Sequence, residues 1–211
     1  MSIDIKGIDD FEYERSFFVR EIPEELVEDS ESSLIISSYF VHDDNYALRV
    51  RLQSSSLHID LTSATDPKQV LDEYRDSFTS GEMAVKGPSY GGTRYEASRA
   101  IDTRIAGELI ARGGDLVIKN RYSVWTGEDG WVFDVYGGAN APLIIAKAAR
   151  SMPVTNLVIP KFCVTEITDQ SRFSNDELSW KPYNTWQEDF ERELATEGPR
   201  FEQIFGHNML S

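Results

Sequence analysis

The stretch Phe11–Val19, which reads FEYERSFFV, alternates like a β-strand but carries unusual residues for one. Successive side chains of an extended chain point to opposite faces, so Glu12, Glu14 and Ser16 share one face. Two carboxylates on one face repel each other unless a cation or a metal ion lies between them. An edge strand with a solvated acidic face would explain this stretch alone, but the later strands favour another explanation.

Composition limits the class of protein and its partners. The chain has 211 residues, 40% of them hydrophobic, with 36 acidic against 21 basic residues and a formal net charge of -15. An acidic surface repels nucleic acid and anionic membranes, so neither duplex nucleic acid nor a membrane is an expected partner. One cysteine excludes an intrachain disulfide, and three histidines with it argue against zinc. No apolar run reaches transmembrane length and no signal-peptide pattern is present, so we expect a cytoplasmic protein.

The remaining chain reads as strands separated by turns, with a few helices. Further strands are expected at residues 33–41, 46–52, 56–62, 84–87, 93–98, 116–122, 131–136 and 142–150. Helices are expected at residues 22–27 and 66–78, after Asp102 as far as Gly113, and in the acidic tail from about residue 184. No repeat or linker divides the chain, so we expect one domain over residues 1–211.

Charged side chains recur on one face of these strands. Arg49 and Arg51 share a face in one strand, as do Lys119 and Arg121 in another, while the opposite face is aliphatic or aromatic. A closed antiparallel β-barrel with a charged lumen and helices outside, an α+β fold, accounts for this pattern. The expected luminal cations are Arg49, Arg51, Lys86, Arg94, Lys119, Arg121 and Lys147, and the expected carboxylates are Glu12, Glu14, Glu96 and Asp134.

So many cations in one lumen call for an anionic guest. Two unit charges ~4 Å apart interact by about 4 kcal/mol at an effective dielectric constant near 20, so unpaired neighbours would oppose folding. A triphosphate or polyphosphate suits the lumen because it is linear and accepts many charge-assisted hydrogen bonds.

The ordered series of charged strands resembles the CYTH superfamily, the triphosphate tunnel metalloenzymes, which include class IV adenylyl cyclases and thiamine and inorganic triphosphatases. Glu12–Phe17 resembles the family's E-x-E-x-K strand, and Val164–Asn175 resembles its V-T-x-D-x-R-Y-S-N segment. Between them the matching stretches are Leu48–Arg51, Val85–Gly87, Arg94–Glu96, Ile118–Tyr122 and Trp131–Tyr136.

The resemblance implies an eight-stranded antiparallel tunnel in which basic side chains hold a triphosphate and acidic ones bind Mg²⁺ or Mn²⁺. Glu12 and Glu14 would then be catalytic metal ligands, with Asp134 as a further metal-side acid and Glu96 as another luminal carboxylate. Arg49, Arg51, Lys86, Arg94, Lys119 and Arg121 would form the phosphate cradle. The ammonium of Lys147, which the family pattern does not contain, would also hold phosphate, in the place of a metal charge.

Three positions depart from the family pattern. Ser16 stands where the E-x-E-x-K strand has lysine, and Lys147 and Ala149 stand where a late strand usually has two glutamates. Replacing two carboxylates by a cation and a methyl group weakens any metal site. The segment between Arg51 and Lys86 is also long for the family and is expected to form a lid or a side wall.

Three functions follow from these observations. The first is a tunnel protein that binds a nucleoside triphosphate or polyphosphate, with weak or lost metal-dependent hydrolysis. The second is an active Mg²⁺- or Mn²⁺-dependent triphosphatase that uses Glu12, Glu14 and Asp134, of which an adenylyl cyclase is a narrower version. The third is a partner-binding barrel without catalysis. Fold alone does not separate them, and the sequence does not indicate an oligomeric state.

Overall fold

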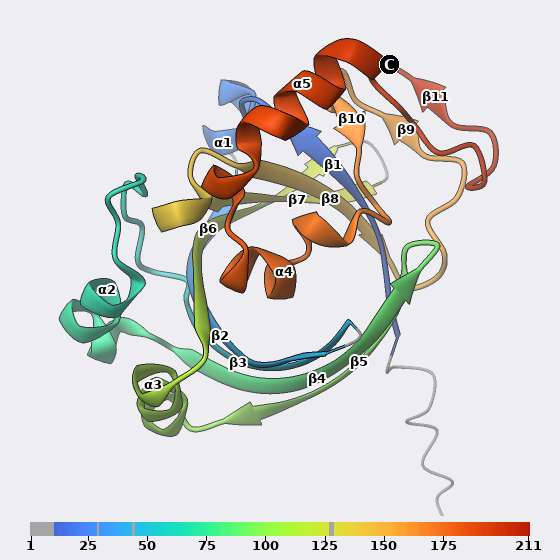
Figure 1. Cartoon of the computed structure of the whole chain (residues 1–211). Coiled ribbons are helices and arrows are strands. Elements are labelled where there is room, and N and C mark those ends of the chain that lie inside the picture. Colours follow the sequence, from blue (N-terminus) through green and yellow to red (C-terminus); the bar gives the residue numbers. More distant parts are fainter. Residues whose placement is uncertain (1–10, 29, 44, 127–128) are drawn as a thin grey trace, which may run out of the picture.

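A closed barrel of eight antiparallel strands dominates the computed structural model, which describes residues 11–28, 30–43, 45–126 and 129–211 (Figure 1). The strands are β1 (Phe11–Val19), β2 (Glu31–Asp43), β3 (Tyr46–Ser54), β4 (Ser80–Tyr90), β5 (Thr93–Ile101), β6 (Asp115–Thr126), β7 (Asp129–Tyr136) and β8 (Ile144–Arg150). They follow one another around the wall in the order β1-β5-β4-β3-β2-β6-β7-β8. The predicted fold class is therefore confirmed.

Strand β1 closes the barrel. It pairs with β8 from Tyr13 opposite Arg150 to Val19 opposite Ile144. Its other edge pairs first with β5 and then with the short strand β10 (Thr165–Glu166). Closure leaves the barrel strands without a free edge to pair with another chain.

The described residues form five α-helices besides the barrel, and a small two-stranded parallel sheet. The helices are α1 (Glu24–Glu28), α2 (Pro67–Glu73), α3 (Thr103–Arg112), α4 (Asn175–Trp180) and α5 (Gln187–Glu197). The predicted cap of α3 is confirmed, because the Asp102 carboxylate accepts hydrogen bonds from two amides of the first turn. The expected helix over 66–78 is shorter, since α2 gives way to a 3-10 turn at residues 75–77. Strands β9 (Val158–Ile159) and β11 (Met209–Leu210) pair with each other.

Helices α2 and α3 pack on the outer face of the barrel, against aliphatic side chains of β2, β3 and β6. In β3 and β6 these aliphatic side chains alternate with the luminal charges. The strand expected at residues 56–62 is wrong, because this segment runs over the outside without pairing. Its apolar side chains, Leu57, Ile59 and Leu61, join the same outer cluster. Both edges of the adjacent strand β3 are already paired in the barrel, so no edge remains for another strand. The long segment between Arg51 and Lys86 therefore builds a side wall.

The C-terminal residues are attached to the outside of β1 through a buried ion pair. Arg15, which is fully buried, donates from Nε and Nη2 to the Glu166 carboxylate at 2.8 and 2.7 Å. Its Nη1 donates to Asn208 Oδ1 at 2.7 Å, and the Glu202 amide donates to Glu166. Arg15 lies on the same strand as the luminal Glu12 and Glu14, but it points outward and attaches the C-terminal residues to the barrel.

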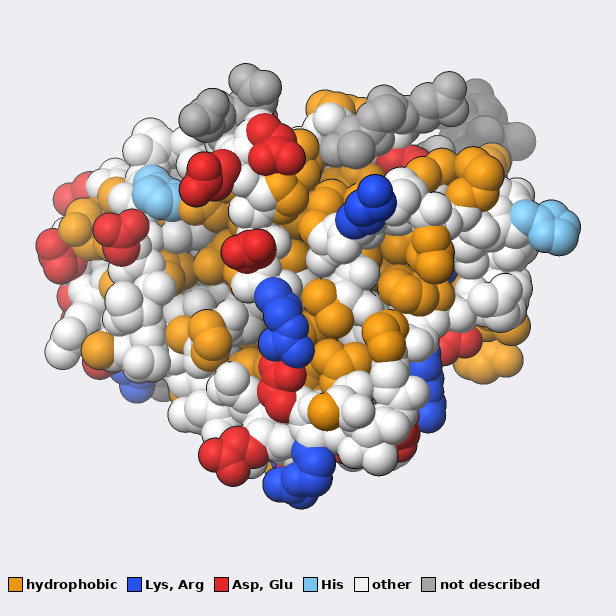
Figure 2. All heavy atoms as spheres, turned by 90° about the horizontal axis from the view of Figure 1, so that it is seen from above, with side chains coloured by type: hydrophobic (Ala, Val, Ile, Leu, Met, Phe, Trp, Pro, Cys, Tyr) orange, Lys and Arg blue, Asp and Glu red, His pale blue; other side chains and the backbone are white. Residues whose placement is uncertain are grey.

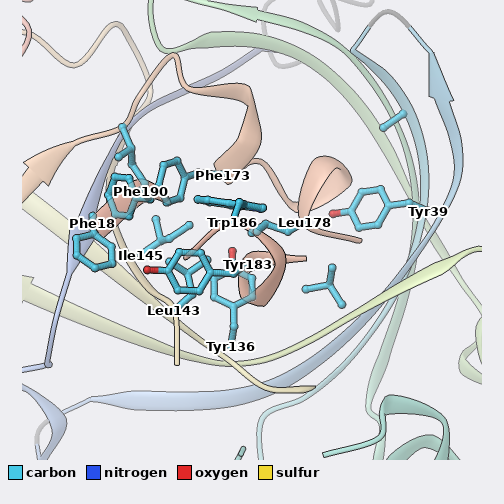
Figure 3. Close-up of a cluster of buried hydrophobic side chains, with 13 residues drawn as sticks. Phe18, Tyr39, Tyr136, Leu143, Ile145, Phe173, Leu178, Tyr183, Trp186 and Phe190 are labelled. Carbon is cyan, nitrogen blue, oxygen red and sulfur yellow. The ribbon is translucent and has the colours of Figure 1, made fainter. Parts of the chain in front are cut away.

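Aromatic side chains from the C-terminal third close one end of the barrel (Figure 3). Figure 1 shows α4 lying over the opening of the ring of strands. Leu178 of α4 and the following Tyr183 and Trp186 pack against luminal residues of several strands, including Phe18 and Tyr136. We call the segment 167–186 the cap. Because the cap covers one end, the lumen is approached from beside it or from the opposite end.

Charge is distributed differently outside the barrel. On the face seen in Figure 2, lysine and arginine side chains are separated from one another and acidic side chains lie among them, so this face has no basic patch. None of the helices in the described part of the chain combines the length and apolar character needed to cross a membrane.

Candidate functional site

Ion pairs link the luminal side chains of β3, β4 and β5. Arg51 Nη2 lies 2.9 Å from Glu82 Oε1, and Arg49 Nη2 contacts the same oxygen. Arg49 Nη2 also lies 2.9 Å from Glu96 Oε1. Glu82 was not among the predicted luminal carboxylates, and it faces Arg51 directly across the β3–β4 ladder. Two guanidinium groups that would repel each other therefore share a carboxylate.

The same series of alternating charges continues to β1. Lys86 Nζ contacts the Glu96 carboxylate and lies 3.2 Å from Glu12 Oε2. Burial opposes ionisation of Glu12, but the Lys86 and Lys147 ammonium groups outweigh it and hold the pKa of the Glu12 carboxyl well below its usual value. Glu12 is therefore an ionised carboxylate that already has a cationic partner.

On the other side of the lumen, Asp134 is shared by two cations. Lys119 Nζ lies 2.6 Å from Asp134 Oδ2, and Arg121 donates from Nε and Nη2 to both oxygens at 2.8 and 3.0 Å. Burial would favour the neutral acid, but Arg121 and Lys119 outweigh it, so the pKa of Asp134 lies well below the usual range. Burial, with the neighbouring Arg121 and Lys147, lowers the pKa of Lys119. We conclude that Arg121 is the permanent charge partner of Asp134.

Lys147 and Glu14 form the pair that bears most directly on metal binding. Lys147 Nζ lies 2.6 Å from Glu14 Oε1, while Ser16 faces Lys147 and Ala149 faces Glu14 across the β1–β8 ladder. Burial opposes the Lys147 charge, but Glu14, Asp134 and Glu12 outweigh it and raise the pKa of the ammonium. The Glu14 carboxylate therefore already has a cationic partner, the charged ammonium of Lys147.

Arg94 is paired with the cap. Its Nη1 and Nη2 donate to the two oxygens of Asp176, at 3.1 and 3.3 Å. Asp176 lies in the first turn of α4, and the adjacent Asn175 accepts from Lys119 Nζ at 3.0 Å. The cap is therefore attached to the luminal charges by polar contacts as well as by its aromatic side chains.

A cavity of about 320 Å³ lies between the cap, β1 and the β4–β5 hairpin. Of the predicted site residues, Glu12, Glu14, Lys86, Arg94 and Lys147 line it. Its remaining polar lining comes mostly from the cap, including Thr168, Asp169, Gln170, Ser171, Ser174, Asn175 and Asp176. The predicted residues Arg49, Arg51, Glu96, Lys119, Arg121 and Asp134 are not among its lining residues. The structure thus brings five of the eleven predicted side chains to one cavity and places the other six in the adjoining ion-pair network.

The predicted excess of seven luminal cations over four carboxylates is smaller in the structure, because Glu82 and Asp176 also pair with these cations. Each of the seven cations forms an ion pair, and the carboxylates involved are Glu12, Glu14, Glu82, Glu96, Asp134 and Asp176. Seven cations face six carboxylates, so an empty lumen does not oppose folding as strongly as the cations alone suggest. Among the described residues, no acceptor bonds the buried Nε of Arg49.

The donor set does not suit Mg²⁺ or Mn²⁺. These ions prefer several oxygen ligands, of which carboxylates are the strongest. The predicted ligands Glu12, Glu14, Glu96 and Asp134 are each paired with lysine or arginine, and the described residues contain no cluster of three acidic, histidine or cysteine side chains that could hold a metal. Metal binding would have to displace Lys147 from Glu14.

Comparison with solved structures identifies the fold. The chain is similar to the crystal structure of the inorganic triphosphatase NE1496, with a TM-score of 0.50 and 20% sequence identity over 80% of this chain and 93% of that chain. This chain has the CYTH tunnel fold. A putative adenylyl cyclase from Hippeastrum, HpAC1, is also similar, with a TM-score of 0.43 and 12% identity over 67% of this chain and 80% of that chain. No family model and no curated protein matches the sequence.

Proposed function

We propose that this CYTH-fold protein binds a triphosphate-containing anion, either a nucleoside triphosphate or an inorganic polyphosphate, and hydrolyses it weakly or not at all. The tunnel fold and the seven luminal cations support the binding part. One observation carries the loss of hydrolysis: Lys147 Nζ lies 2.6 Å from Glu14 Oε1 on the strand that would hold a metal. Because NE1496 is an inorganic triphosphatase, tripolyphosphate is the first ligand to test.

An ammonium group can replace part of the role of a metal ion. Lys147 contributes a positive charge and hydrogen-bond donors for phosphate oxygens, as lysines do in other phosphate sites. It does not activate a water molecule in the way that a bound metal does. Because phosphoryl transfer depends mostly on positioning and charge stabilisation, the site retains what binding needs and loses what water attack needs.

Binding at such a site is an exchange of partners. A phosphate oxygen that reaches Lys86, Arg94 or Lys147 must compete with the carboxylate already bound there. A triphosphate competes well because its several anionic oxygens lie on one molecule and engage several cations at once. The proposal therefore predicts selectivity for longer phosphate chains over orthophosphate.

The catalytic part is tested by restoring the two glutamates. Lys147→Glu with Ala149→Glu should raise Mg²⁺- or Mn²⁺-dependent phosphate release from tripolyphosphate, while the wild type releases little or none. Lys147→Gln with Ala149→Gln is the matched control, since it changes size similarly without adding carboxylates. Rapid metal-dependent hydrolysis by the wild type, abolished in Glu12→Ala, would replace this proposal with the active triphosphatase.

The ion pairing also favours a second candidate, a partner-binding barrel without a small ligand. Every predicted phosphate-binding cation already has a carboxylate partner within the chain, so the barrel is electrostatically nearly complete by itself. Under this candidate, neither tripolyphosphate nor ATP would raise the melting temperature at any concentration, whereas a bound ligand must do so by linkage.

A further inference from the structure

The bidentate pair between Arg94 and Asp176 occupies the guanidinium on the wall of the cavity. The Asp176 oxygens lie 3.1 and 3.3 Å from Nη1 and Nη2, and both side chains line the cavity. Nε of Arg94 donates to Gly87 O at 2.6 Å, and Nη2 also donates to Asn45 O at 3.1 Å. These backbone contacts hold the guanidinium in place. The edge formed by Nη1 and Nη2 therefore points to the position of Asp176, and any anion that replaced Asp176 would meet the same two donors.

The edge of a guanidinium that binds a carboxylate through two oxygens binds a phosphoryl group in the same way. Asp176 therefore stands where two oxygens of a phosphate would lie against Arg94. Its neighbour Asn175 similarly supplies an oxygen to Lys119 Nζ at 3.0 Å. The first turn of α4 thus provides oxygen ligands to two of the cations predicted to hold phosphate.

Asp176 differs from the other paired carboxylates in where it is anchored. Glu12, Glu14, Glu82, Glu96 and Asp134 lie on barrel strands, as do the cations with which they pair. Asp176 lies on a helix of six residues outside the barrel ladders. Separation of Asp176 from Arg94 therefore requires no strand pairing to break.

We propose that Asp176 is a built-in counter-anion that sets the affinity of the cavity for phosphate, and that a ligand phosphoryl group replaces it at Arg94. The inference rests on the proposed function, because it concerns the same cavity. It identifies Asp176 as an affinity-determining residue that the family resemblance did not indicate. It also predicts that a ligand needs a group with two anionic oxygens to take its place.

Calorimetric titration with tripolyphosphate in the presence of EDTA tests the inference on Asp176→Asn. Asparagine keeps the size of the side chain and removes its charge, so we expect the affinity to rise by roughly tenfold, equivalent to about 1.4 kcal/mol. Asp189→Asn is the matched control, because Asp189 is 66% exposed on α5 and pairs with Arg192 away from the cavity. The double variant Arg94→Met with Asp176→Asn should bind more weakly than Asp176→Asn alone.

The outcomes separate the inference from the proposed function. Equal binding by wild type and Asp176→Asn, or weaker binding by the variant, overturns the counter-anion and leaves the proposed function standing. Absence of binding by both proteins removes the two together. Hydrogen exchange on the unmodified protein gives a second measurement: amides of residues 175–180 should exchange faster with tripolyphosphate present, and unchanged or slower exchange contradicts the inference.

Discussion

Replacing Asp134 with asparagine should destabilise the protein more than any exposed charge substitution. The carboxylate is fully buried and accepts three charge-assisted hydrogen bonds from Lys119 and Arg121. Removing one partner of a buried ion pair costs about 3–5 kcal/mol, because the remaining charge is left without compensation. Lys119, whose pKa burial already lowers, can lose its proton in the variant, so we expect a value near the lower limit.

Urea unfolding at pH 7 measures this loss, and the melting temperature provides a second estimate. A protein of this size loses roughly 2–4 °C per kcal/mol, so Asp134→Asn should melt about 6–12 °C lower than the wild type. Lys119→Met completes a double-mutant cycle, in which the two changes together should cost less than their sum by about 1–3 kcal/mol. A loss below about 1 kcal/mol for Asp134→Asn, or strict additivity in the cycle, would refute the claim that luminal charges depend on one another.

Three further predictions concern acid stability, the cap and the hairpin beside the cavity. Burial opposes ionisation of Asp134 and Asp176, but Arg121 and Arg94, respectively, outweigh it, so both carboxyls have lowered pKa values in the folded protein. The two ionised carboxylates therefore contribute their full stabilisation of the fold above the unfolded pKa of about 3.9. This contribution is lost as the pH falls below that value. The urea midpoint should therefore fall between pH 6 and pH 2, less steeply in Asp134→Asn, and an unchanged midpoint would contradict this. Leu178→Ala removes a fully buried side chain of the cap and should cost about 2–5 kcal/mol in urea unfolding; a loss under about 1 kcal/mol would mean that the cap does not seal the barrel. Gly92→Ala places a Cβ 2.6 Å from Glu14 O at a φ of +68°, so thermal melting should show a loss above about 1 kcal/mol, and a neutral result would contradict the hairpin geometry.

Much of the barrel could be predicted from the sequence because the side-chain period of a strand is two. The alternation of Arg49 and Arg51 with aliphatic residues requires a polar and an apolar face, and it predicts the lumen wherever it recurs. Helix caps are equally local, as the Asp102 cap shows. Residues 56–62 show the limit of this reasoning. Leu57, Ile59 and Leu61 alternate as in a strand, but this extended segment packs one face on the outside of the barrel without pairing with a strand.

The counter-charges could not be predicted as readily. Glu82 could have been predicted, because it shares a strand face with Ala84 and Lys86. The strand was expected to begin at Ala84, however, and in fact begins at Ser80. Asp176 pairs with Arg94 across 82 positions of the sequence, and no local pattern indicates that the first turn of α4 faces the cavity. Which carboxylates neutralise the luminal cations depends on the tertiary arrangement. The sequence alone suggested a strong need for an anionic ligand, and the pairing of Glu82 and Asp176 with luminal cations reduces that need.

One titration measures whether the cavity binds a triphosphate through its luminal cations. Tripolyphosphate is titrated calorimetrically, with EDTA present, into the wild type and into Lys147→Met with Glu14→Gln, which removes a whole ion pair and leaves no unmatched charge. Arg150→Met with Asp129→Asn is the control, since it removes an ion pair that involves the same strand, β8, away from the cavity lining. We expect equal binding by the wild type and the control. The cavity variant should bind at least roughly tenfold more weakly, a loss of about 1.4 kcal/mol. Absence of binding by the wild type, or equal affinity in all three proteins, would contradict this expectation.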